Sequence, residues 1–276
     1  ADSSGKVVHL HERECSLQRR FQKIVEEAPA ALLPRYDRDA MCAAAVGIAR
    51  AARYTNAGTV EFIYGGGKFY FLEMNTRLQV EHPVTEAITG IDLVAEQFRI
   101  AGGAPLGRAQ ADIAENGHAI ECRLYAEDAD RDFAPCTGSV LRWRPPHGDR
   151  IRVDAGIEEG SIVTSAFDPL LAKLVLHAGN RDTAVAAAIG ALADTVLLGC
   201  GSNIGFLRRL LSLPAVRQGA LHTGLMAEEM AALRAPPLTA AVMQAAVAAA
   251  AMHASEVRRA ADAVPALHAA IGHWRN

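Results

Sequence analysis

Residues 73–83 read EMNTRLQVEHP and carry chemically active side chains at every second position. In an extended chain these side chains would project to one side, because strand residues alternate between two faces. The row consists of Glu73, Asn75, Arg77, Gln79 and Glu81. All five bear groups that coordinate a metal ion or grip an anion. The alternative interpretation is the solvated face of an edge strand, which is the usual reason for such an alternation.

A second glutamate, Glu61, precedes Glu73 by twelve residues, and three consecutive glycines lie between them. The aromatic and β-branched runs 59–64 and 68–74 on either side of the glycines predict a β-hairpin. Without a bulge, the two glutamates would be opposite or diagonal neighbours, where like charges need a cation between them. The pair therefore predicts a Mg²⁺ site, with Asn75 as a neutral oxygen ligand. A one-residue bulge in the turn would instead point one glutamate to solvent.

Arg77 and Glu81 suit a small oxyanion substrate. A guanidinium can donate two parallel hydrogen bonds to a planar carboxylate-like anion. A nearby carboxylate can take the proton of the anion's hydroxyl. An Arg77–Glu81 ion pair without a chemical role is the alternative. Upstream, residues 14–23 hold three cations and two amides, which could bind phosphates, although basic runs are more often solvated faces.

The composition excludes several classes of protein. Of 276 residues, 50% are hydrophobic and 21% are charged, which predicts packed cores, two folded units and no general disorder. The net charge of −3 argues against nucleic-acid binding, and no apolar run reaches the roughly 18 residues of a membrane span. Five cysteines without paired spacing suit a reducing compartment. The chain opens without Met, so we expect it to be part of a longer polypeptide.

Sequence patterns predict the elements that must position these side chains. Apolar spacing, glycines and capping residues give the following order: a short β-type run at 7–10, a helix over 35–53, the hairpin at 59–74, a helix over 85–101, short strands from 117 to about 178, helices over 184–198 and 204–211, and an alanine-rich helix within 238–263. We expect a first unit at residues 1–108, a second at 117–225 and a helical extension at 226–276.

The run EMNTRLQVEHPVTE at residues 73–86, with Glu61 before it, resembles the signature of biotin carboxylases of the ATP-grasp superfamily. Three further stretches carry the same resemblance: residues 13–20, 22–29 and 117–128. The resemblance covers residues 1–225 and is closest to the α subunits of acyl-CoA carboxylases of the propionyl, methylcrotonyl or acetyl type. It implies an α+β fold, in which the second half of an ATP-grasp domain precedes a biotin carboxylase C-terminal domain, a small β-rich unit with helices.

The resemblance also implies a reaction and roles for individual residues. The reaction is the ATP-dependent carboxylation of biotin with bicarbonate through carboxyphosphate. The implied ligands of Mg²⁺ or Mn²⁺ are Glu61, Glu73 and Asn75. Residues implied to border ATP are Gln18, Lys23 and Ile63, and those implied to hold bicarbonate are Lys23, Arg77, Gln79 and Val80. The implied catalytic residues are Arg77, Glu81 as the base, and Arg123, which would stabilise the biotin enolate.

The resemblance further implies partners. Biotin would arrive on a separate carrier domain or subunit, because no Ala-Met-Lys-Met acceptor motif is present. A homo-oligomer and a carboxyltransferase subunit are implied too, with neither nucleic acid nor membrane as a partner, in the cytoplasm or the mitochondrial matrix. The family's N-terminal domain and its lid over the phosphates are not in these residues, so we expect the isolated chain to be incomplete and inactive.

Two positions depart from the family pattern. Phe21 stands where the family often has a histidine that contacts the nucleotide, and Phe167 stands where a tyrosine is usual. Asp168 and Lys173 fit a family motif beside Phe167, but because of this departure we assign Asp168 no role beyond support. Two alternatives stay open: a non-catalytic fragment that keeps the fold and subunit interface, or another ATP-grasp ligase such as a carbamoyl-phosphate synthase module. For the latter we would not expect the Arg-x-Gln-x-Glu-His-Pro run.

Overall fold

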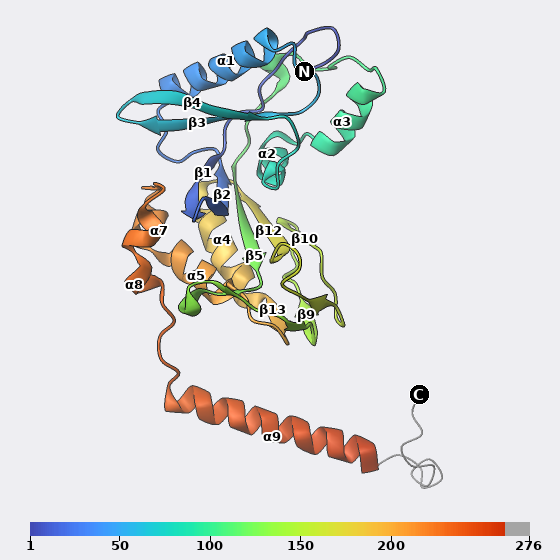
Figure 1. Cartoon of the computed structure of the whole chain (residues 1–276), viewed down its shortest axis with the longest axis vertical. Helices are drawn as coiled ribbons and strands as arrows, with labels where there is room; N and C mark the ends of the chain where they lie inside the picture. Colours follow the sequence, from blue (N-terminus) through green and yellow to red (C-terminus); the bar gives the residue numbers. More distant parts are fainter. Residues whose placement is uncertain (263–276) are drawn as a thin grey trace. The chain divides into compact units, whose positions relative to one another are not determined.

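The protein, whose structure is a computed structural model, is described here over the backbone of residues 1–262 and the side chains of residues 1–252. The chain divides into one unit of residues Ala1–Arg234 and another of residues Ala235–Asn276, and Figure 1 labels the elements of each. Within the described residues, no helix is both long and apolar enough to cross a membrane.

The first half of the chain begins with two strands and a helix, continues with a hairpin and ends with two short helices. These elements are β1 (Glu14–Arg19), β2 (Gln22–Ala28), α1 (Arg35–Ala51), β3 (Thr59–Gly65), β4 (Lys68–Asn75), α2 (His82–Thr89) and α3 (Leu93–Ala101). The second half is richer in short strands. Its strands are β5 (His118–Tyr125), β6 (Glu127–Asp128), β7 (Ala134–Pro135), β8 (Gly138–Ser139), β9 (Arg142–Arg144), β10 (Ile151–Ala155), β11 (Ile162–Val163), β12 (Leu170–Ala178) and β13 (Val196–Leu198). Its helices are α4 (Arg181–Asp194), α5 (Ile204–Ser212), α6 (Pro214–Arg217), α7 (Leu225–Glu228), α8 (Met230–Leu233) and α9 (Ala240–Asp262).

A five-stranded sheet in the order β1-β2-β5-β12-β10 forms the centre of the first unit. All its neighbouring strands are antiparallel. All eight residues of β5 are buried, as expected for a middle strand that is covered on both faces. The strand order brings β1 and β2 from the predicted first unit beside β5, β12 and β10 from the predicted second unit. The boundary between 108 and 117 stays a prediction.

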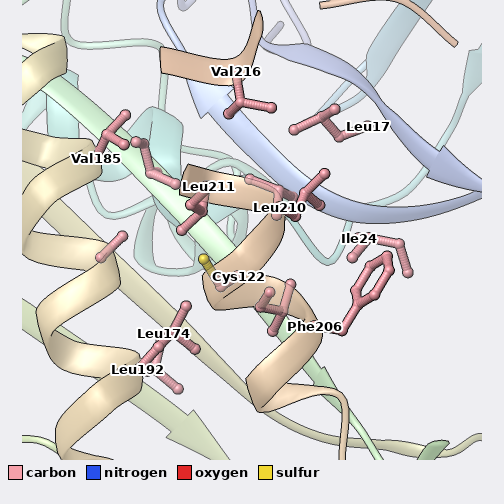
Figure 2. Packing of buried hydrophobic residues seen from close by; sticks show 14 of the residues in the cluster. Leu17, Ile24, Cys122, Leu174, Val185, Leu192, Phe206, Leu210, Leu211 and Val216 are labelled. Atoms are coloured by element: carbon pink, nitrogen blue, oxygen red, sulfur yellow. The ribbon is translucent and has the colours of Figure 1, made fainter. Parts of the chain in front are cut away.

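Helices cover both faces of the central sheet. On one face α4 and α5 close the main hydrophobic core, and Figure 2 shows Leu192 of α4 and Leu210 of α5 in the same cluster as Cys122 of β5. On the other face α2 packs through Val84 and Ile88 against a smaller cluster. Truncation of a fully buried leucine in such a core costs about 2–5 kcal/mol of stability. The sheet is therefore held in place by packing on both of its faces, including the face toward α2.

The predicted hairpin is present, but its register differs from the expectation. Gly65 pairs with Lys68 across a two-residue turn, whose two glycines have φ of 59° and 72°, typical of the turns that suit hairpins. Continued regularly, this register would place Glu61 opposite Leu72. The strands instead shift by one residue, which leaves Leu72 unpaired and sets Glu61 opposite Glu73. The bulge thus lies in β4 rather than in the turn, and it brings the two acids together.

Several sequence predictions hold and others are wrong. The helix predicted at 35–53 is confirmed as α1, the helix at 204–211 as α5 and the alanine-rich helix as α9, with residues 263–276 outside the described part. The helix predicted at 85–101 is wrong, because Gly90 ends α2 in a left-handed conformation and Asp92 caps α3 through the amide of Ala95. The helix predicted to reach residue 198 ends at Asp194, and β13 follows it. Residues 7–10 form no strand.

Candidate functional site

The polar row of residues 73–81 is extended only over its first part. Strand β4 ends at Asn75 and Glu81 is the N-cap of α2, so the prediction of one extended row is wrong beyond Asn75. Pro83 suits the first turn of a helix, and Leu78 packs against a separate hydrophobic cluster, which draws the chain out of the strand. The bend nevertheless carries Gln79 and Glu81 back toward the acids of the hairpin.

The hairpin holds two acids and one amide in direct contact. Glu61 and Glu73 are cross-strand partners, and the Asn75 side-chain amide donates to Oε1 of both, at 3.1 Å each. Among the described residues, Glu73 has no ion pair with a basic side chain, and no group of three His, Cys, Asp or Glu residues could hold a metal by itself. Two carboxylates and a carboxamide are ligand types that suit Mg²⁺, which commonly completes its shell with phosphate oxygens and water. In the structure the nitrogen of Asn75 faces the carboxylates, so its oxygen would bind a metal only after the amide turns over.

Lys23 of β2 joins the hairpin to the start of α2. Its Nζ donates to Oε1 of Glu61 at 3.0 Å and to Oε1 of Glu81 at 2.7 Å. Gln79 adds a bond from its Nε2 to Oε1 of Glu61 at 2.7 Å. Burial opposes the charge on Lys23, but the neighbouring Cys15 and Glu81 raise its pKa to about 12. Lys23 therefore stays cationic between two carboxylates.

Glu81 is held from two sides by basic residues. Its Oε2 accepts a bond of 2.9 Å from NH2 of Arg123, and its side chain is 3% exposed. Burial works to raise the pKa of Glu81, but the charges of Arg13 and Lys23 outweigh it and lower that pKa below its usual value. Arg123 also forms an ion pair with Oε1 of Glu26. Glu81 is thus ionised, and Arg123 links it to a deeper carboxylate.

The remaining predicted residues lie at the edge of this network. Arg77 is exposed, and among the described residues it donates only to the backbone of Leu78, at 3.3 Å, and to Oδ1 of Asn75, at 3.4 Å. The alternative Arg77–Glu81 ion pair is not among the interactions of the described residues. The carbonyl of Val80 accepts a bond of 2.8 Å from Lys173.

A cavity of about 1180 Å³ adjoins the network. The predicted site residues that line it are Gln18, Lys23, Glu61, Ile63, Arg77, Gln79 and Glu81. Ile63 is 57% exposed, and Gln18 donates from its side chain to the carbonyl of Cys15 at 2.8 Å. The cavity is large enough for a nucleotide-sized ligand. The ligand assignments of these residues stay predictions.

Sequence reasoning missed two basic residues that support the site. Arg13 donates to Oε1 of Gln79 at 2.6 Å and to the hydroxyls of Thr59 and Thr85 at 3.0 Å each. Lys173 fixes the backbone carbonyl before Glu81 and lies 3.3 Å from a carboxylate oxygen of Asp154. Both basic residues belong to segments that fit the family pattern. This fit indicated that the segments matter, but it did not indicate which groups Arg13 and Lys173 contact.

Two family models match the chain. One is described as "Carbamoyl-phosphate synthase L chain, ATP binding domain" and matches residues 1–109, and the other as "Biotin carboxylase C-terminal domain" and matches residues 121–228. The second match distinguishes among enzymes that share the first domain. The chain belongs to the biotin carboxylase family. The predicted membership and the α+β fold, with an ATP-binding domain followed by a C-terminal domain, are confirmed.

Relatives of known function agree with this assignment. A pyruvate carboxylase subunit of Methanothermobacter thermautotrophicus is 46% identical over 228 residues, which are 83% of this chain and 46% of the relative. Biotin carboxylase of Nostoc sp. is 44% identical over 229 residues, 83% of this chain and 51% of the relative. The mitochondrial propionyl-CoA carboxylase alpha chain of Homo sapiens is 46% identical over 230 residues, with 82% and 32% covered. The chain thus spans about half, or less, of the length of these relatives.

Solved structures show the same fold. The biotin carboxylase domain of a thermophilic 2-oxoglutarate carboxylase, bound to bicarbonate, matches with a TM-score of 0.83 and 41% identity over 85% of this chain and 53% of that one. The corresponding domain dimer from Hydrogenobacter thermophilus, in complex with MgADP, ADP and bicarbonate, also gives 0.83 and 41%, over 86% and 52%. These biotin carboxylase domains therefore bind the ligand classes that the sequence predicts for this chain.

Proposed function

We propose that the protein containing this chain carboxylates biotin with bicarbonate at the expense of ATP. The observation that carries the proposal is one continuous polar network, in which Lys23 joins Glu61 to Glu81 and Arg123 continues from Glu81 into the sheet. Glu61 and its neighbour Glu73 lie at one end of this network, and the buried Arg123 lies at the other. Such an arrangement suits a reaction that needs phosphoryl transfer and an oxyanion in adjacent places.

The hairpin end of the network is the proposed nucleotide end. Glu61, Glu73 and Asn75 would hold Mg²⁺ or Mn²⁺, which when bound would neutralise phosphate oxygens of ATP. The identical charges of the two opposite glutamates support a cation there. Gln18, Lys23 and Ile63 line the cavity beside the hairpin, and we assign them to the nucleotide.

The turn between β4 and α2 is the proposed bicarbonate end. Arg77, Gln79 and Val80 would hold the anion together with Lys23, and Glu81 would take the proton of its hydroxyl. The oxygen freed in this way attacks the γ-phosphorus, so that ADP leaves and carboxyphosphate forms. In the structure the charges of Arg13 and Lys23 lower the pKa of Glu81 against the effect of burial, which makes it a weak base. An entering anion that draws Lys23 away would raise this pKa and strengthen Glu81 as a base.

Arg123 is proposed to act on biotin. It is only 8% exposed, and its guanidinium donates to Glu81, which lines the cavity. Burial opposes its charge, but Glu26 outweighs this effect and raises its pKa further above the usual value. Carboxyphosphate would break at its C–O bond to CO2 and phosphate, and the phosphate would take the N–H proton of the biotin ureido group. A permanent cation at this place would stabilise the resulting enolate, whose nitrogen then attacks CO2.

The partners follow from the proposed reaction. Biotin would be supplied on a carrier domain or subunit, and the carboxyl group would pass to a carboxyltransferase subunit. Relatives named as an alpha chain of propionyl-CoA carboxylase and as one subunit of pyruvate carboxylase support a partner subunit in general. A homo-oligomer and a cytoplasmic or mitochondrial location, consistent with five free cysteines, belong to the same proposal. For residues 1–276 alone we expect no turnover.

The test is bicarbonate-dependent ATP cleavage with Mg²⁺, measured on the complete polypeptide in which this chain occurs. We expect Glu61→Gln and Glu73→Gln each to lower the rate by about 100-fold, because each removes a charged ligand from the metal site. Glu159→Gln is the matched control, since Glu159 pairs with Arg142 on the surface. A native protein without bicarbonate-dependent cleavage would refute the function, and near-native rates in both site variants would refute the metal assignment.

A further inference from the structure

Behind Arg123 lies a pair of acids that the proposed reaction does not use. Glu26 of β2 and Glu121 of β5 are direct cross-strand partners, and both are 0% exposed. They point to the face of the sheet that α2 covers, as do their neighbours Ala28 and Ala119. Two buried like charges facing each other destabilise a sheet, so their presence calls for a physical reason.

Arg123 supplies part of that reason. It lies two residues beyond Glu121 on β5 and therefore on the same face, where its NH2 forms ion pairs with Oε1 of Glu26 and Oε2 of Glu81. One guanidinium thus bridges a carboxylate in the sheet and the proposed base of the site. Among the described residues the side-chain oxygens of both acids lack a hydrogen-bond partner, and the two acids differ in that Glu26 has the ion pair with Arg123.

The charges show which of the two acids is ionised. Burial raises the pKa of Glu121 well above its usual value, and nearby Glu26 raises it further. Burial also raises the pKa of Glu26, to about 7, but Arg123 opposes that rise. Lys173 also lowers the pKa of Glu121 and Lys23 that of Glu26, but among the described residues only Arg123 forms an ion pair with either acid, and it does so with Glu26. Glu121 therefore keeps its proton, and above about pH 7 Glu26 is the countercharge of Arg123.

We propose that Glu26 is a positioning residue, which holds the Arg123 guanidinium from beneath so that it stays beside Glu81 and in reach of the biotin carried into the site. Protonated Glu121 leaves this hold undisturbed, because it adds no second negative charge that could draw Arg123 away. The inference rests on the proposed function for its kinetic consequences, but the placement of Arg123 can be tested without it.

The kinetic test compares Glu26→Gln with two matched variants in the complete polypeptide. For Glu26→Gln we expect kcat for biotin carboxylation to fall about 100-fold, as for a misplaced reacting group. ATP cleavage in the absence of biotin should stay within about threefold of native. Glu26→Asp, which keeps the charge, should restore part of the lost rate.

Glu27→Gln controls for the loss of a buried charge in β2. Glu27 is also buried, but it pairs with Arg181 and His118 away from Arg123. It should keep biotin carboxylation within about threefold of native. In the Arg123→Ala background, Glu26→Gln should add no further loss, because it acts through Arg123.

Three results would overturn the proposal: native biotin turnover in folded Glu26→Gln, an equal loss in Glu27→Gln, or a further tenfold loss in the double variant. A crystal structure of Glu26→Gln decides the matter independently of activity. We expect Arg123 to leave its position beside Glu81, and an unchanged guanidinium would refute the positioning role even if the protein catalyses another reaction. Absence of biotin carboxylation in the native protein would count against the proposed function alone.

Discussion

The buried carboxyl of Glu26 makes the stability of the central sheet depend on pH in a direction that can be measured. Burial raises its pKa from 4.5 to about 7, against the opposing attraction of Arg123. Between pH 4.5 and pH 7 the carboxyl of Glu26 therefore binds a proton more tightly in the folded protein than in the unfolded chain. Stability due to this group therefore falls as the pH rises from 4.5 through 7.

The size of the effect follows from the same two values. Each pH unit between the folded and unfolded pKa is worth about 1.4 kcal/mol. Between pH 5 and pH 8 the titration of Glu26 should thus lower the free energy of opening the sheet by about 2–3 kcal/mol. Glu26→Gln removes the titrating group. We therefore compare the opening free energy of this variant with that of the native protein at each pH. From pH 5 to pH 8 the variant should gain about 2–3 kcal/mol relative to the native protein.

Hydrogen–deuterium exchange of peptides that cover β2 and β5 measures the opening free energy in the whole protein. Val25→Ala is the control, since Val25 precedes Glu26 in the same strand and is buried but uncharged. Its difference from the native protein should be the same at pH 5 and pH 8. The pKa assigned to Glu26 is wrong if the opening free energy of Glu26→Gln, relative to the native protein, does not change with pH. It is also wrong if the variant loses stability relative to the native protein as the pH rises.

Two further variants test the supports of the site. Arg13→Lys should raise KM for bicarbonate about tenfold, with little change in KM for ATP. The reason is that a lysine cannot hold Gln79, Thr59 and Thr85 together. Steady-state kinetics in which both KM values change equally would contradict this prediction. Phe21→Gly should stabilise the β1–β2 hairpin by about 0.5–1 kcal/mol, because Phe21 is 97% exposed in a left-handed turn conformation with φ of 66°. Thermal unfolding measures this gain, and a loss of stability would show that the Phe21 ring makes contacts that outweigh the strain.

Glu61 and Glu73 were correctly predicted to be cross-strand neighbours, but the prediction assumed a regular hairpin. An even separation of Glu61 and Glu73 predicts that they face each other only if the turn is regular about a single central residue. The structure instead has a two-residue turn and one extra residue, Leu72, in β4. These two departures cancel. Sequence periodicity does not locate a bulge, because the extra residue is chosen by packing and twist along the whole ribbon.

The rest of the site depends on contacts between distant segments. The run from Arg77 to Glu81 contains the right residues, but its bend into α2 depends on Leu78, which packs against residues far along the chain. Glu26 and Glu121 are separated by 95 positions in the sequence and become neighbours only when β2 and β5 pair. Nothing in the local pattern of either strand predicts that pairing.

The resting network explains how a site so rich in buried charge can accept anions. Lys23 and Arg123 are each shared between two protein carboxylates, so neither leaves a buried charge unpaired. Arg77, in contrast, has no carboxylate partner among the described residues and lies exposed at the edge of the cavity. An incoming anion would therefore meet Arg77 first and then exchange with Glu61 and Glu81 for Lys23. Lys23 would thus keep a negatively charged partner while the site fills, because the anion takes over hydrogen bonds that Glu61 and Glu81 accept in the structure.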